Sequence, residues 1–88
     1  MKAVVSVIGK DKTGIIAAAA TELARLGINI LDISQTIMQT NFVMVMLVDA
    51  GKSPAFDKIE AALIAALKEF EVVVHVQQED LFNSMQRV

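Results

Sequence analysis

The stretch that decides the fold is residues 9–15, Gly9-Lys10-Asp11-Lys12-Thr13-Gly14-Ile15, a polar loop with a glycine at its start and another near its end. The residues before it, 2–8, are rich in β-branched side chains, which predicts a buried, central β-strand. Those after it, 14–26, carry apolar residues at helical spacing and four consecutive alanines, which predicts a helix. Such a loop presents free backbone N–H groups at a helix start and is typical of a binding site.

A short amide side chain is expected beside this loop. Gly27 supplies a left-handed end for the first helix, and Gly27-Ile28-Asn29-Ile30 opens the next strand. We therefore expect the Asn29 amide to lie close to the loop, in a site without catalytic groups.

A β-hairpin follows. Residues 29–39 alternate apolar with polar side chains, which predicts a half-buried strand with one polar face. After a polar turn at 39–41, residues 42–48 are apolar at every position, which predicts an antiparallel strand covered on both faces.

The C-terminal half continues with a helix, a strand and a tail. We expect Ser53 to be the N-cap of the second helix and Pro54 its first residue. Its apolar rhythm runs from Phe56 to Phe70. Residues 72–77 alternate as a last strand. The tail then carries four apolar residues at roughly helical spacing: Leu81, Phe82, Met85 and Val88.

The order strand, helix, strand, strand, helix, strand predicts an α+β fold, a ferredoxin-like βαββαβ sandwich. A four-stranded antiparallel sheet would carry two helices on one face, with a short C-terminal helical tail. We expect one domain over 1–88, with its core at 1–78 and the tail at 79–88. The other face of the sheet would expose one of two sets: Phe42, Met44 and Met46, or Val43, Val45 and Leu47. Such a patch predicts a homodimer or a higher homo-oligomer.

Composition excludes several kinds of function. The net charge is −2 and the eight basic residues are scattered, so no basic stripe indicates direct nucleic-acid binding. No cysteine occurs, which removes disulfides, thiolate metal sites and thiol nucleophiles. The N-terminus is too short and polar for a signal peptide or a membrane span. We expect a cytoplasmic protein that does not bind membranes.

No pattern of catalytic residues stands out either. The glycine spacing from Gly9 to Gly14 is that of a phosphate loop, but Ile15 and Ile16 stand where Lys and Ser/Thr are required. The fold also houses acylphosphatases, yet the loop lacks the arginine that would hold a phosphoryl group. His75 has no neighbours at metal-ligand spacing. We expect no enzyme activity, no metal and no cofactor.

Two motifs carry a family resemblance. Asp11-Lys12-Thr13-Gly14-Ile15 resembles the Asp/Asn-x-x-Gly-Ile/Leu/Val loop of ACT domains, and Gly27-Ile28-Asn29-Ile30 resembles the start of their second strand. The βαββαβ order extends the resemblance to the whole chain. The ending at 78–88 is similar to the tail of short bacterial proteins that consist of one ACT domain and have no characterised function.

The resemblance implies a regulatory domain that binds a small ligand, most often an amino acid, between subunits. In the family, loop amides hold the ligand carboxylate and the strand-two Asn, often from a neighbouring subunit, binds its polar groups. By position, this implies Asp11, Thr13, Gly14 and Ile15 in the loop, with Asn29 across the interface. Serine-binding members carry His where this chain has Gly9, which argues against serine through that contact set.

Structural roles are available for the same residues. Gly14 suits a tight strand-to-helix transition, Asp11 suits an N-cap, and Asn29 suits a turn that bonds its own backbone. Two hypotheses therefore stand. The first is an amino-acid-binding homodimer that changes its affinity for a partner protein. The second is a ligand-independent interaction module that uses the exposed sheet face or the C-terminal tail.

Overall fold

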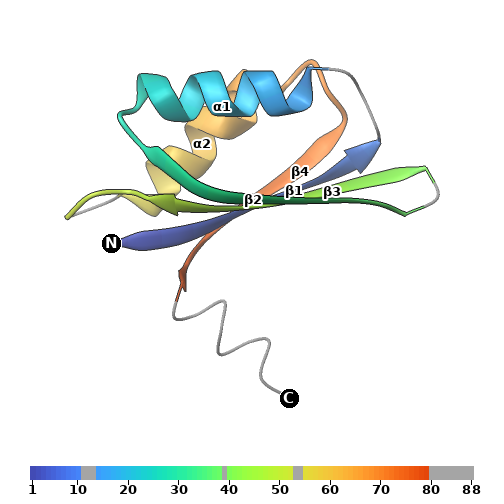
Figure 1. Ribbon diagram of the computed structural model, residues 1–88. Coiled ribbons are helices and arrows are strands. Elements are labelled where there is room, and N and C mark those ends of the chain that lie inside the picture. Colours follow the sequence, from blue (N-terminus) through green and yellow to red (C-terminus); the bar gives the residue numbers. More distant parts are fainter. Residues whose placement is uncertain (11–13, 39, 53–54, 80–88) are drawn as a thin grey trace.

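The computed structural model describes residues 1–10, 14–38, 40–52 and 55–79 (Figure 1). Six elements follow one another in these residues: β1 (Lys2–Lys10), α1 (Ile15–Arg25), β2 (Asn29–Met38), β3 (Asn41–Asp49), α2 (Phe56–Ala66) and β4 (Val72–Gln78). This order confirms the predicted ferredoxin-like βαββαβ fold.

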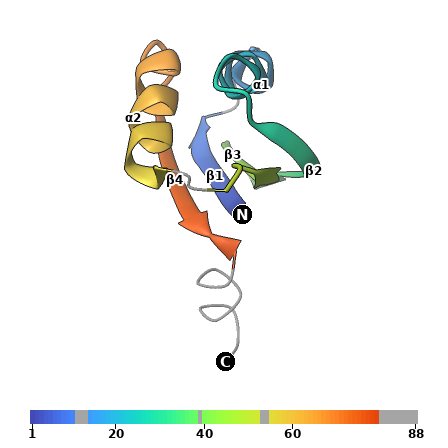
Figure 2. The same cartoon turned by 90° about the vertical axis from the view of Figure 1, so that its left-hand side faces the viewer.

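The four strands form one antiparallel sheet in the order β2-β3-β1-β4. β1 therefore lies between β3 and β4, as its valine-rich sequence predicts. Both helices cover the same face of the sheet (Figure 1). Figure 2 shows α2 along β4 and α1 nearer to β2. The opposite face of the sheet carries no helix among the described residues, and we call it the open face.

The core lies between the sheet and the helices, and strand register decides which side chains enter it. Val5 is paired with Met46 and Val7 with Met44, and these four side chains are fully buried. The alternate residues of β3 point to the open face, where they are only half-buried. The register thus selects between the two predicted sets: Val43, Val45 and Leu47 lie on the open face, and Phe42, Met44 and Met46 lie in the core. The expectation that β3 is covered on both faces does not hold among the described residues.

The helix boundaries differ from the prediction for α2. Its N-cap is Ala55, not Ser53, and Ser53 and Pro54 lie outside the described residues. At the other end, the Phe70 N–H donates to the Leu67 carbonyl at 2.9 Å. A hydrogen bond of this i to i+3 type closes a tight turn, through which the chain leaves the helix. The apolar rhythm therefore continues to Phe70, which packs on the core, although the helix itself ends at Ala66.

The second strand is far more exposed than its alternation predicts. Every residue from 31 to 37 is exposed, and the apolar side chains of Leu31, Ile33 and Ile37 keep 45%, 37% and 60% of their surface in contact with solvent. The reason is position: β2 is an edge strand, and the register shifts between Ile30 and Asp32. The apolar face of β2 has no cover within one chain.

Candidate functional site

The loop between β1 and α1 ends at a helix start whose backbone donors receive no cap from the side chains that the structure describes. Gly14 is the N-cap residue, with φ at +98°, and its carbonyl accepts a hydrogen bond from the Ala18 N–H at 2.9 Å. The buried Ile15 side chain anchors the first turn in the core. No acidic residue occupies that turn. An uncapped helix N-terminus of this kind favours a carboxylate or another anion. Asp11 and Thr13 lie outside the described residues.

Gly9 is a glycine because β4 approaches it too closely for any side chain. A Cβ at this position would lie 2.5 Å from the Glu71 carbonyl oxygen and 2.6 Å from Val72 Cγ1. Contacts below 3.0 Å require the backbone to shift. The histidine that serine-binding ACT domains carry here therefore cannot be accommodated without moving β4. The sequence shows that the histidine is missing, but the packing that excludes it becomes visible only in the fold.

A lysine next to the loop is paired with an acidic residue. Lys10 Nζ lies 3.7 Å from Glu71 Oε2, and both side chains are largely exposed. The pair is worth little in solvent, but it places a carboxylate beside the only described lysine of the loop. The charge of Glu71 thus partly offsets that of Lys10 beside the loop.

Asn29 lies at the opposite end of the sheet from the β1–α1 loop of the same chain. Asn29 is paired with Asp49, and Asp49 is paired with Lys2 at the start of β1. The loop follows Lys10, at the other end of β1. Gly14 and Asn29 also flank the two ends of α1 (Figure 1), whose 11 residues span about 17 Å. Within one chain, Asn29 therefore lies far from Lys10 and Gly14, the described ends of the loop. A site that contains both requires a second copy.

The two edges of the sheet differ in how readily each could pair with a strand from another molecule. At the β4 edge, the Val76 N–H donates to Glu60 Oε1 of α2 at 2.9 Å, so a helix side chain occupies an outward donor. At the β2 edge, the Ile33 N–H donates to the neighbouring Asp32 Oδ1 at 2.9 Å. That bond is local and exposed, so an incoming strand can replace it. A long edge strand with exposed apolar residues is a template for pairing, and here β2 is that strand.

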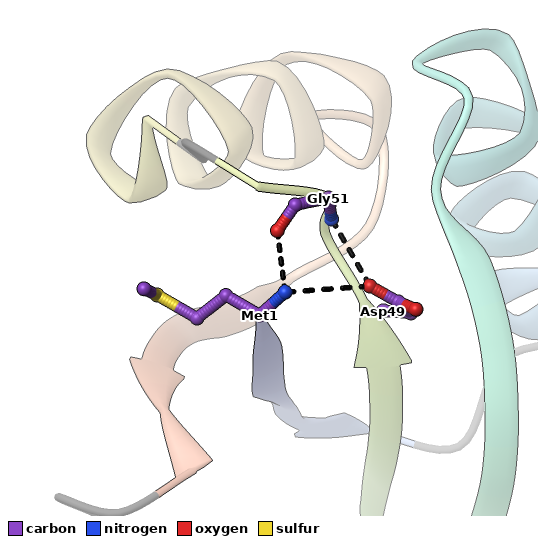
Figure 3. Close-up of polar contacts among 3 residues, drawn as sticks. All are labelled: Met1, Asp49 and Gly51. Atoms are coloured by element: carbon purple, nitrogen blue, oxygen red, sulfur yellow. Dashed lines mark hydrogen bonds and ion pairs between the residues drawn. The ribbon is translucent and has the colours of Figure 1, made fainter.

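The Asn29 end of the sheet is held by the N-terminus. The Met1 ammonium donates to the Gly51 carbonyl and lies 3.6 Å from Asp49 Oδ1, which also accepts the Gly51 N–H at 3.1 Å (Figure 3). The hydrogen bond from the Gly51 N–H holds the pKa of the Asp49 carboxyl below its usual range, and the positive charge of the Met1 ammonium adds a smaller effect in the same direction. The sequence signal for this network is Asp49-Ala50-Gly51, a typical turn composition, which sequence reasoning did not single out.

His75 is an exposed residue of β4, level with Ser6 of β1 on the open face. In the ranges that the structure describes, no three potential ligands of the His, Cys, Asp or Glu type gather around a common point. The same ranges contain no helix long and apolar enough to cross a membrane.

Three comparisons place the chain among known proteins. The ACT domain family model matches residues 2–77. A UPF0237 protein of Clostridium acetobutylicum is 53% identical, with 100% of each chain covered. The solved structure of an ACT domain protein from Streptococcus pneumoniae is 35% identical with a TM-score of 0.82, covering 93% of each chain. The regulatory subunit of aspartate kinase from Thermus thermophilus matches at 25% identity and a TM-score of 0.67, over 86% of this chain and 50% of that one.

Proposed function

The chain belongs to the ACT domain family, and on that premise we propose that it is a regulatory domain that binds an amino acid or a similar small carboxylate between two copies. Binding changes its affinity for a partner protein. ACT domains are regulatory rather than catalytic, and the resemblance to an aspartate kinase regulatory subunit agrees with a regulatory role.

The observation that carries the proposal is the separation of Gly14 and Asn29 combined with the open edge of β2. If two β2 strands pair antiparallel about a two-fold axis, the start of one strand lies beside the end of the other. Asn29 of the second copy then lies beside Met38, whose neighbour in the sheet, Asn41, is paired with Lys10. The second copy's Asn29 thus comes to the end of the sheet at which the loop begins.

The chemistry at that end suits an amino acid. The N–H groups at the start of α1 would hold the carboxylate, through the backbone of Gly14 and Ile15. Asp11 and Thr13 of the same loop and the second copy's Asn29 would bind the remaining polar groups. Because Gly9 leaves no room for the histidine contact, the ligand is recognised without an imidazole.

A thermal-shift screen of the twenty amino acids tests the proposal. A ligand at a hundredfold excess over its dissociation constant adds about 2.7 kcal/mol to the stability of the folded state. Asn29→Ala should abolish the shift. Gln78→Ala, which removes an amide from the opposite edge strand, is the matched control and should retain it. No shift with any amino acid at millimolar concentration contradicts the proposal.

Subunit complementation tests whether the site is shared. Gly14→Ala and Asn29→Ala should each eliminate binding. A refolded equimolar mixture should regain roughly a quarter of the sites, because half of the dimers are mixed and each of those has one intact site. The stoichiometry is measured by isothermal titration calorimetry with the amino acid found in the screen. A mixture that binds no more than its components would place both residues outside a shared site.

The open face supports a second candidate function, a ligand-independent interaction module. Val43, Val45 and Leu47 lie on that face, which is independent of the loop. Under this alternative, Asn29→Ala and Gly14→Ala leave partner binding unchanged.

A further inference from the structure

Residues 33–37 of β2 have a sequence that is chemically the same in both directions, Ile33-Ser34-Gln35-Thr36-Ile37. The middle residue is an amide, a hydroxyl residue stands on each side of it, and an isoleucine stands at each end. All five residues are exposed, on the outer strand of the sheet beside α1 (Figure 2). A two-fold dimer requires a surface that is complementary to itself, and this segment has that property.

The two faces of β2 carry different parts of this segment. Its odd-numbered residues are paired with the core residues Phe42, Met44 and Met46 of β3, so they lie on the helix side. Ser34 and Thr36 alternate with them and lie on the open face. A second β2 strand that continues the sheet must therefore set odd-numbered residues opposite odd-numbered ones.

The backbone of the same segment is ready to form a ladder. The Ile33 N–H donates to Asp32 Oδ1, an exposed bond within β2, and so points to the edge. Because backbone groups alternate in direction along a strand, Gln35 and Ile37 also present their N–H and C=O groups at the edge. The register shift lies before Asp32, so the stretch from Asp32 to Met38 is regular.

We propose that two copies pair through β2 with Gln35 on the two-fold axis. Gln35 then faces Gln35 of the second copy, each Ile33 faces an Ile37, and each Ser34 faces a Thr36. The inference rests on the proposed function, because it specifies the strand pairing on which the shared site depends.

This register matches every facing pair in character. On the helix side, Ile33 and Ile37 remain 37% and 60% exposed in one chain, and facing each other they remove apolar surface from water. The two Gln35 amides can each donate a hydrogen bond to the other's oxygen. On the open face, the hydroxyls of Ser34 and Thr36 are placed to hydrogen-bond across the strands.

The neighbouring registers match less well. With the axis at Ser34 or at Thr36, Gln35 faces an isoleucine in place of its own copy. The axis at Ser34 also draws the irregularity before Asp32 into the ladder. The axis at Thr36 leaves position 33 without a strand residue opposite it, because β2 ends at Met38.

The pairing also ends with two copies. The β4 edge is less open, because the Val76 N–H donates to Glu60 Oε1 at 2.9 Å and the Val72 N–H donates to the Phe70 carbonyl at 3.1 Å. Since each copy uses its β2 edge in the same contact, the assembly is closed. The helical tail expected from the sequence at 80–88 lies outside the described residues, and the pairing does not depend on it.

Disulfide crosslinking tests the register, because the chain contains no cysteine. Ser34→Cys and Thr36→Cys are made in chains of different tag length, refolded as an equimolar mixture and oxidised. Directly facing residues of this kind have Cα atoms about 4.5 Å apart, within disulfide range, whereas diagonal neighbours are about 7–8 Å apart. The proposal predicts a covalent heterodimer in at least fivefold higher yield than either homodimer in the same sample.

Each single variant is the matched control for the mixture. A homodimer of Ser34→Cys in equal or higher yield would place the axis at Ser34, and the same result for Thr36→Cys would place it at Thr36. No crosslink in any sample would mean that the β2 strands do not face each other. Each of these results overturns the proposal.

Charge substitution on the axis gives a second readout that needs no oxidation. Only a residue on the axis faces its own copy, so Gln35→Glu alone and Gln35→Lys alone each set two like charges opposite each other. Each variant should sediment at half the mass of the parent dimer, and the equimolar mixture should regain the full mass. A Gln35→Glu chain that keeps the parent mass, or a mixture that stays at half mass, overturns the proposal.

The amino-acid-induced thermal shift of the parent chain separates this inference from the proposed function. A thermal shift in a protein that lacks the predicted crosslink overturns the register and leaves ligand binding in place. The predicted crosslink in a protein that responds to no amino acid overturns the ligand proposal and supports the register.

Discussion

Gly9 of β1 and Glu71, which precedes β4, lie so close that a Cβ on Gly9 would be 2.5 Å from the Glu71 carbonyl oxygen. The contact is with backbone, so it cannot be relieved by a side-chain rotation. It fixes how β4 meets β1 directly before the candidate binding loop.

Gly9→Ala should therefore destabilise the fold by about 1–3 kcal/mol, the usual cost of inserting a group into a packed region. The free energy of unfolding is measured by urea denaturation. Gly51→Ala is the control, because a Cβ there meets nothing within 4 Å and the only cost arises from its φ of +87°, about 1 kcal/mol. If Gly9→Ala is no more destabilising than Gly51→Ala, the backbone before β4 does not approach Gly9 as closely as described.

Glu60 should matter more than other surface glutamates, because its carboxylate accepts the Val76 N–H at the edge of β4. Glu60→Ala leaves that partly buried donor without its acceptor and should cost about 1–3 kcal/mol. Glu60→Gln keeps an acceptor and should recover much of the loss. Hydrogen exchange of the Val76 amide is the specific measurement: it should accelerate in Glu60→Ala and not in Glu69→Ala, an exposed glutamate later in the chain. Equal exchange in the two variants would contradict the bond.

Asp49 should contribute to the pH dependence of stability. The Gly51 N–H and the Met1 ammonium lower the pKa of its carboxyl in the folded state. A lowered folded-state pKa means that the stabilisation is present above the unfolded-state pKa, about 3.9, and is lost as the pH falls through the folded value. Asp49→Asn should thus flatten the decline of the melting temperature below about pH 4. Glu69→Gln, which removes an exposed carboxylate, is the control. A decline as steep in Asp49→Asn as in the parent chain would exclude this contribution.

The sequence predicts the elements of this fold well because their signals are local. Alternation and helical spacing locate β1 and α1, and Gly27 has the left-handed φ, +75°, that its position after the helix predicts. What local patterns do not contain is the order of strands in the sheet. The alternation in β2 is that of a half-buried strand, yet Ile33 and Ile37 are exposed because β2 lies at the edge.

The candidate site has the same limit. Motif and spacing pick out Gly14 and Asn29 but not the distance between them, which depends on the direction in which α1 crosses the sheet. Nor does the pattern around Gly9 reveal that β4 excludes a side chain there, since the contact joins residues about sixty positions apart. Composition predicts Ser53 as the N-cap of α2, whereas the N-cap is Ala55 and the helix begins at Phe56.

The exposed apolar residues of β2 give the sharpest test of the proposed dimer. Ile33 and Ile37 lie on the open edge strand, where a charged side chain opposes pairing with another strand. Ile37→Lys should break the pairing of two β2 strands and so halve the mass of the assembly. It should also abolish the amino-acid-induced thermal shift, because Asn29 of the second copy then no longer reaches the loop. Because Ile37 is 60% exposed, the stability of the single chain should change by no more than about 0.5 kcal/mol.

Ile64→Lys is the matched control, since Ile64 of α2 is 52% exposed and lies away from β2. It should leave both the mass and the ligand response intact. A ligand response that survives Ile37→Lys in a protein of halved mass would show that one chain binds the ligand alone. That result would show that the second copy is not part of the site. Because Gly14 and Asn29 of one chain lie at opposite ends of α1, Asn29 would then have no part in binding.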